Sequence, residues 1–198
     1  MGLMAFHFVL PSRCKLVTML RERPGTAEWL FLLTDHLIDP MRNPLDFMMT
    51  DEQRVPGTLN RDFLDASQEL LAENPIVREL TIDLGKDQRW RQNQLFDIVG
   101  DNQQEVHWVQ KAFRGDKPFH PDGQSSSGIT CCYTEPATAI EIADGLESIT
   151  RARAEAAFPP TDDLDIPTAD EAMETIAMFS AFYRASAAAG MLAVQFTD

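Results

Sequence analysis

The sequence has few of the features that mark secreted, membrane-spanning or disulfide-rich proteins. Three of its 198 residues are cysteines, and Cys14, Cys131 and Cys132 are too irregularly spaced for a disulfide framework. A reducing cytoplasm fits this cysteine content best. No run of about 18 apolar residues is present, which argues against a membrane-spanning helix. The apolar first residues lack a basic segment and precede Pro11, so we expect no cleaved secretion signal.

Motifs that mark metal, cofactor or catalytic sites are also scarce. The four histidines, His7, His36, His107 and His120, include no pair at the i, i+4 spacing of a helical zinc site. There is no glycine-rich phosphate loop followed by a lysine, and no serine stands in a nucleophile elbow. We therefore expect no bound metal, no cofactor and no catalytic residue.

Basic residues are few, which narrows the choice of partner. Seventeen lysines and arginines face 31 aspartates and glutamates, so the formal net charge is −14 and the isoelectric point is near 4.6. Proteins that bind nucleic acid concentrate positive charge against the phosphates, so binding to DNA, RNA or an anionic membrane surface is disfavoured. A basic protein partner fits this charge, because an acidic surface speeds its encounter. Solubility alone would explain it equally well.

The acidic residues are concentrated in the C-terminal third. Residues 133–198 contain twelve acids and three bases, whereas residues 1–25 contain one acid and four bases. The cluster at 162–165 lacks the glycine and the distal glutamate of a calcium loop, which favours a solvated acidic loop. We expect an acidic binding face that includes Asp162, Asp163, Asp165, Asp170, Glu171 and Glu174.

Apolar periodicity predicts a mostly helical protein with a small sheet. We expect strands at residues 3–10, 129–133 and 191–197, and helices at residues 12–23, 26–38, 60–73, 90–99, 134–158 and 168–189. Residues 76–84 read as a strand or an extended lead-in, and residues 114–128 read as a surface loop. Long βαβ repetition is absent, so we predict a single α+β domain whose sheet includes the N- and C-terminal strands.

Several short segments resemble the YfbM-like family of small bacterial proteins. They are Met1-Gly2-Leu3, Leu80-Thr-Ile-Asp83 with Lys86 and Trp90, Ala112-Phe113-Arg114-Gly115, Leu146-Glu-Ser-Ile149 and Phe182-Tyr183-Arg184. The resemblance covers residues 1–12 and 80–198, and it leaves a divergent or inserted segment at about 26–79. It departs from the family at Asn93-Gln94, where a leucine–histidine pair is common. The resemblance implies a compact α+β domain. It implies no activity, because the family has no generally assigned function.

These observations favour a non-enzymatic protein that presents an acidic surface to a basic protein partner. In its most specific form this hypothesis describes an immunity protein that occludes a bacterial toxin, with Trp29 and Trp108 as apolar anchors. One alternative is an enzyme of unknown reaction whose site lies near His107, His120 and Cys131. Another is a self-associating domain that uses the apolar segment 29–49 as a dimer surface.

Overall fold

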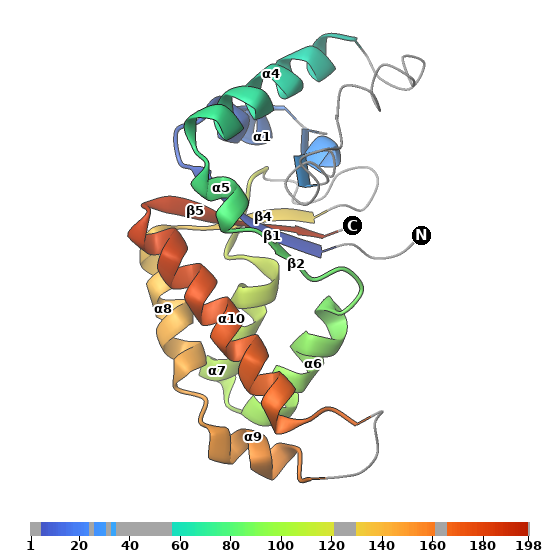
Figure 1. Cartoon of the computed structure of the whole chain (residues 1–198), viewed down its shortest axis with the longest axis vertical. Coiled ribbons are helices and arrows are strands. Elements are labelled where there is room, and N and C mark those ends of the chain that lie inside the picture. The colour runs from blue at the N-terminus through green and yellow to red at the C-terminus, as the bar shows by residue number, and fades with distance from the viewer. Residues whose placement is uncertain are drawn as a thin grey trace.

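The computed structural model describes residues 5–23, 26–30, 33–34, 57–120, 130–160 and 166–197. A small antiparallel sheet crosses the middle of the molecule, and helices cover both of its faces (Figure 1). The predicted α+β class is confirmed, and so is the inclusion of the N- and C-terminal strands in the sheet. Within the described part of the chain, no helix is both long and apolar enough to cross a membrane.

The two strands from the ends of the described chain lie next to each other inside the sheet. β1 (Ala5–Pro11) pairs along its whole length with β5 (Met191–Thr197). β4 (Thr130–Thr134) pairs with the other side of β5. Two short strands form the edges, so the order of the sheet is β2-β1-β5-β4-β3, with β2 at Ile82–Asp83 and β3 at Lys117–Pro118.

The strand register fixes which side chains share a face of the sheet. His7 pairs with Gln195, which pairs on its other side with Cys132. The neighbouring row contains Phe6, Phe196 and Cys131. Because successive side chains of a strand point to opposite faces, the first row faces one helical layer and the second row faces the other.

The smaller helical layer consists of segments from the first half of the chain (Figure 1). It contains α1 (Lys15–Glu22), the 3-10 turn η1 (Thr26–Trp29), α4 (Gly57–Glu73) and α5 (Ile76–Glu79). Their apolar sides contribute Leu16, Leu20, Phe63 and other residues to the core. Of the segment predicted to be divergent or inserted, residues 57–79 form α4 and α5, and residues 35–56 lie outside the described residues.

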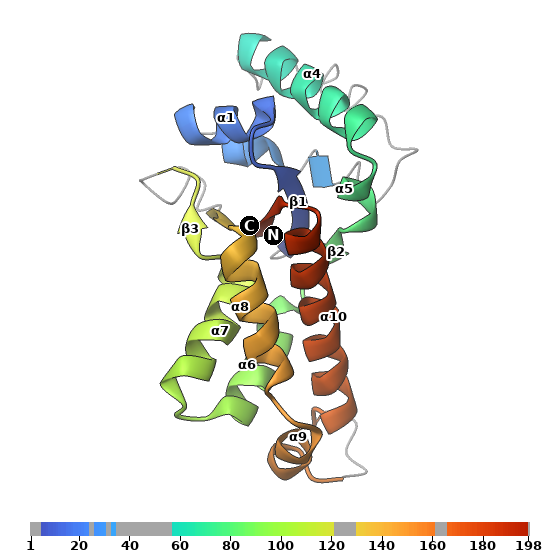
Figure 2. The same ribbon diagram turned by 90° about the vertical axis from the view of Figure 1, so that its left-hand side faces the viewer.

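The larger layer lies on the opposite face of the sheet. Four of its helices run away from the sheet, and the fifth closes the far end (Figures 1 and 2). They are α6 (Gln88–Val99), α7 (Gln103–Arg114), α8 (Pro136–Glu147), α10 (Ala169–Ala188) and, at the far end, α9 (Arg151–Ala157).

Three local predictions from the sequence are wrong. Residues 76–84 were expected to be extended, but residues 76–79 form the helix α5 and only Ile82–Asp83 form a strand. The single helix expected over 134–158 is divided into α8 and α9, because Ser148 and Thr150 stand at the junction. The Ser148 hydroxyl donates to the carbonyl of Gly145 at 2.7 Å, and such local bonds compete with a continuing helix. The loop expected over 114–128 contains β3, whose Lys117 pairs with Tyr133 of β4.

The best-defined helix start in the sequence is confirmed. Thr168 and Glu171 form a capping box at the start of α10, in which each side chain bonds to the backbone of the other residue. Gly190 follows the helix with a φ of +67°, a conformation that favours glycine, and the chain then enters β5. The cap and the glycine therefore set the length of the longest described helix.

Candidate functional site: the acidic face of α8, α9 and α10

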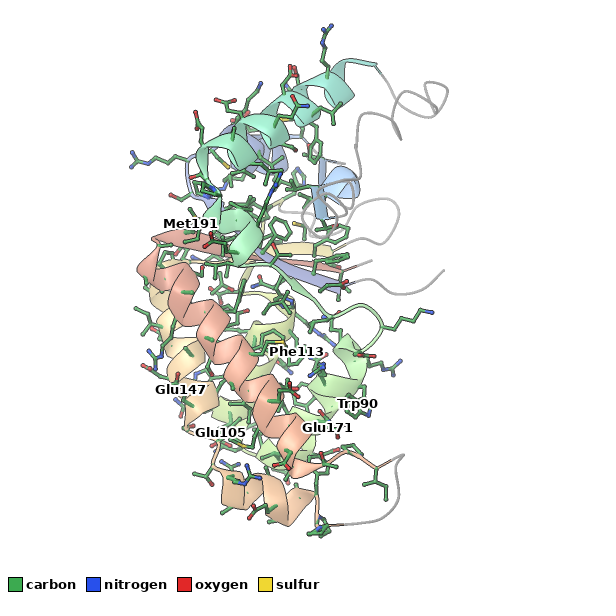
Figure 3. The ribbon with its side chains drawn as sticks, in the orientation of Figure 1. Trp90, Glu105, Phe113, Glu147, Glu171 and Met191 are labelled. Carbon is green, nitrogen blue, oxygen red and sulfur yellow. The ribbon has the colours of Figure 1, made fainter. Side chains whose placement is uncertain are left out.

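The outer sides of α8 and α10 form one continuous surface that is joined by an arginine. The two helices lie side by side in both views (Figures 1 and 2). Nη2 of Arg184 on α10 donates to Oδ1 of Asp144 on α8 at 2.6 Å, and its Nε donates to Oε1 of Glu147 at 2.8 Å. All three side chains are about half exposed, and the Arg184 guanidinium lowers the pKa of the Glu147 carboxyl. Figure 3 shows Glu147 on α8 and Glu171 at the start of α10.

Every arginine of the last third of the chain is bound by carboxylates. Arg151 of α9 pairs with Glu155 at 3.0 Å and with Asp170 of α10. Arg153 pairs with Glu105, and Arg184 pairs with Asp144 and Glu147. Because the acids outnumber these arginines, the surface keeps a net negative charge after the internal pairs have formed. We call the exposed carboxylates of this surface the acidic face: Glu141, Asp144, Glu147, Glu155, Asp170 and Glu174.

The acidic face also contains apolar surface. Ile140 on α8 is 46% exposed and lies one turn before Asp144. On α10, the exposed stripe between Glu174 and Arg184 contains Ala177 and Ala181. These exposed apolar side chains lie on the same two helices as the exposed carboxylates.

The predicted acidic residues of α10 have different roles. Asp170 is exposed and bonds to Arg151, and Glu174 is exposed one turn later. Glu171 is committed to the helix start, because its Oε2 accepts from the backbone nitrogen of Thr168 at 2.8 Å. The remaining predicted acids lie outside the described residues, namely Asp162, Asp163 and Asp165.

The sequence analysis missed the acidic residues of α8 and α9. Glu141, Asp144 and Glu147 stand at intervals of three between the apolar residues that predicted the helix. That spacing places them together on the outward side of a helix, so the signal was present in the sequence. Their meeting with Arg184 depends on the packing of α8 against α10, which the sequence does not reveal.

The two predicted tryptophan anchors have different outcomes. Trp108 is half-buried, and its indole lies against Gly145 of α8. Part of its surface is therefore used in packing α7 against α8, and its contact with a partner stays a prediction. The side chain of Trp29 lies outside the described residues.

The geometry does not bring all three residues of the enzymatic alternative together, although the amide of Phe119, next to His120, bonds to the carbonyl of Cys131 at 3.3 Å. Cys131 is 5% exposed and lies in the row of Phe196, facing the smaller helical layer. His107 is exposed on α7, in the layer on the other side of the sheet, and His120 follows β3. Burial raises the pKa of the Cys131 thiol well above its usual value, which disfavours the reactive thiolate.

The two adjacent cysteines cannot act as a pair, since Cys132 points to the face opposite Cys131. Burial raises the pKa of Cys132 as well. In the described ranges, no three side chains of histidine, cysteine, aspartate or glutamate are grouped so that they could hold a metal ion.

No protein-family model matches the chain, and no curated protein does. Among solved structures, a match is found with the crystal structure of YfbM from Escherichia coli, a protein of unknown function. This chain resembles YfbM. The match covers 98% of this chain and 99% of the YfbM chain, with 12% sequence identity and a TM-score of 0.46.

Proposed function

We propose that this protein is a non-enzymatic binding domain whose acidic face receives a basic protein partner. The observation that carries the proposal is the pairing of Arg151, Arg153 and Arg184 with carboxylates. These arginines are not available to attract an anion, and the surplus of acids attracts cations. The same charge argues against nucleic acid and anionic membranes as partners.

The proposed mechanism is occlusion. The negative potential of the acidic face steers lysines and arginines of the partner toward α8 and α10, and the carboxylates then pair with them. Apolar contact with Ile140 supplies the desolvated centre that ion pairs at the rim cannot supply. In its specific form the partner is a bacterial toxin, and the protein is the immunity protein that covers its active surface. A cytoplasmic location is part of this proposal and is supported by the three free cysteines.

The decisive experiment is a binding titration against the product of the neighbouring gene, because immunity genes stand beside their toxin genes. The variant Glu141→Lys/Glu174→Lys reverses two exposed charges of the acidic face. We expect it to weaken binding at least about tenfold, and we expect wild-type binding to weaken as the salt concentration rises.

The matched control is Glu69→Lys/Glu73→Lys, which makes the same change of net charge on exposed positions of α4. α4 lies at the other end of the molecule (Figure 1). We expect this control to change binding less than about threefold, since its charges are beyond the screening length of about 10 Å. An equal loss in both variants, or the absence of binding in moderate salt, would contradict the proposal.

A further inference from the structure

The last turn of α7 is held by side chains from three other elements. Nε2 of His7 on β1 donates to the carbonyl of Ala112 at 3.0 Å, and the hydroxyl of Tyr183 on α10 donates to the same oxygen at 2.8 Å. Gln88 of α6 donates to the carbonyl of Phe113 at 3.1 Å. The last carbonyls of a helix have no partner within the helix, so these side chains replace the missing bonds.

The His7 ring has a defined protonation state in this arrangement. Its Nε2 faces a carbonyl oxygen, so this nitrogen carries the hydrogen and Nδ1 of the neutral ring carries none. His7 is 1% exposed, and within the described part of the chain its Nδ1 has no hydrogen-bond partner. The rings of Phe179 and Phe182 meet the imidazole nearly at right angles, with centroids 5.0 and 6.0 Å away.

The other groups around His7 carry no negative charge to balance a protonated ring. The nearest strand offers one neutral acceptor, Oε1 of Gln195, which is buried and has no hydrogen-bond partner among the described residues. Tyr183 of α10 is neutral, since burial raises its pKa, and its oxygen accepts from Gln195 of β5 at 2.9 Å. Cys132 of β4 lies beyond Gln195 in the same row, and its thiol is neutral too.

The charged groups of the neighbouring elements are engaged elsewhere or face away. On α7, Lys111 pairs with Asp116 at 2.6 Å and Glu105 pairs with Arg153. On α6, Arg91 donates to Thr175. On β2, Asp83 pairs with Phe6 in register and therefore faces the opposite side of the sheet. Among the described residues, none of these carboxylates bonds to the His7 ring.

We infer that His7, Ala112 and Tyr183 form an acid-sensitive latch between β1 and the end of α7, which opens when the imidazole takes up a second proton. The new Nδ1–H would be a buried donor that is bonded to no acceptor in the closed form, on a charged ring between two phenyl groups. Such a group is costly inside the fold and is readily hydrated outside it. Separation of α7 from β1 relieves that cost, while α1 and α4 on the other face of the sheet are not involved.

The direction of the pH dependence follows from burial. Burial lowers the pKa of His7 from its ordinary value of 6.5 to about 4 in the closed form. An open, hydrated imidazole titrates near 6.5, so the open form binds the proton more tightly between these two values. The equilibrium constant for opening should therefore rise about tenfold for each pH unit as the pH falls from about 6.5 to 4.

Amide hydrogen exchange, corrected for the intrinsic rate at each pH, tests the inference. The Gly115 amide, which bonds to the carbonyl of Lys111, reports on the latch, and the Asn74 amide at the end of α4 reports on the other layer. From pH 7 to pH 4.5, we expect the exposure of Gly115 to increase at least tenfold more than that of Asn74. Equal increases would indicate global unfolding and would overturn the inference.

Two variants distinguish the opening of the latch from the other effects of low pH on the protein. His7→Gln keeps an N–H that can reach Ala112 but does not titrate, so its Gly115 amide should lose the pH dependence. His107→Gln removes an exposed histidine and should keep it. If His7→Gln does not fold at pH 7, an NMR titration of the wild-type ring decides. A pKa near 6.5 with unchanged exchange of Gly115 would refute the latch, and a strongly lowered pKa accompanied by local exchange would support it.

Discussion

The indole of Trp108 lies so close to Gly145 that a methyl group on Gly145 would come within 2.2 Å of the ring carbon Cδ2. This contact lets α7 approach α8 closely, and it explains why a glycine stands in the last turn of α8. Glycine in a helix interior costs about 1 kcal/mol relative to alanine.

Replacing this glycine is the first prediction. Gly145→Ala should lower the free energy of unfolding by about 1–3 kcal/mol, because the ring must shift and overpacking outweighs the helical preference of alanine. Urea unfolding measures the change. The variant Trp108→Leu/Gly145→Ala should recover part of the loss, and a Gly145→Ala protein that is more stable than the wild type would contradict the described contact.

The ion pair between Arg153 and Glu105 gives the second prediction. The guanidinium donates to both carboxylate oxygens, at 2.7 and 2.6 Å, and also to the carbonyl of Ile98. Arg153→Met should destabilise the protein by about 2–3 kcal/mol, because Glu105 would be left buried without a partner. This is less than for a fully buried pair, since the Arg153 side chain is 36% exposed.

Arg184→Met is the matched control for this prediction. It removes an arginine that also binds two carboxylates, but all of these side chains are about half exposed. Exposed ion pairs contribute little to stability, because solvent and salt screen them, so its effect on urea unfolding should be small. Equal effects of the two substitutions would show that burial does not set the strength of the Arg153 pair.

The ion pair between Arg153 and Glu105 also predicts that the stability of the folded protein depends on pH. The hydrogen bonds from Arg153 lower the pKa of the Glu105 carboxyl, so the folded state binds a proton less tightly than the unfolded state. The stabilisation is complete above the ordinary glutamate pKa of about 4.3 and is lost as the pH falls through the lower folded value. Glu105→Gln should therefore be less stable than the wild type at pH 7, and the difference should shrink near pH 3.

Tyr183 gives the fourth prediction. Its hydroxyl donates to Ala112 and accepts from Gln195, and all three groups lie in the core. Tyr183→Phe should cost about 1–3 kcal/mol, because the amide of Gln195 would lose its buried partner. Tyr133→Phe removes a hydroxyl from a half-buried ring and should have little effect. Thermal unfolding of the two variants at neutral pH provides the comparison.

Thiol labelling gives the fifth prediction. Burial raises the pKa of Cys14, Cys131 and Cys132, so each thiolate is scarcer at pH 7.5 than in a free cysteine. Native protein should react with a thiol reagent more slowly than free cysteine, and denatured protein should label all three thiols quickly. A single thiol that labels faster than free cysteine would instead favour the enzymatic alternative.

The parts of the fold that were predictable are those with a strong local signal. The capping box at Thr168 and Gly190 after α10 fix the ends of a helix through backbone bonds within a few residues. The junction at 148–150 was missed, because Ile149 keeps the apolar periodicity while Ser148 ends the helix through its hydroxyl. β3 was missed because two residues are too few for an alternating pattern.

The candidate site was predictable in its charge but not in its assembly. The excess of acids after residue 133 indicates where the negative surface lies. Which carboxylates share Arg184 depends on contacts between α8 and α10, residues 37 and 40 positions apart. The latch depends on a contact between His7 and Ala112, which are 105 positions apart in the sequence. No local sequence pattern indicates that contact.

The shortness of the outermost strands has a consequence for behaviour at high concentration. In the described part of the chain, β2 and β3 each contain two residues, and they flank the long inner strands. Each of these edge strands offers an incoming polypeptide only two residues whose amides and carbonyls it could extend. We expect the native molecule to resist fibril formation through strand addition, so that aggregation would have to begin from an unfolded form.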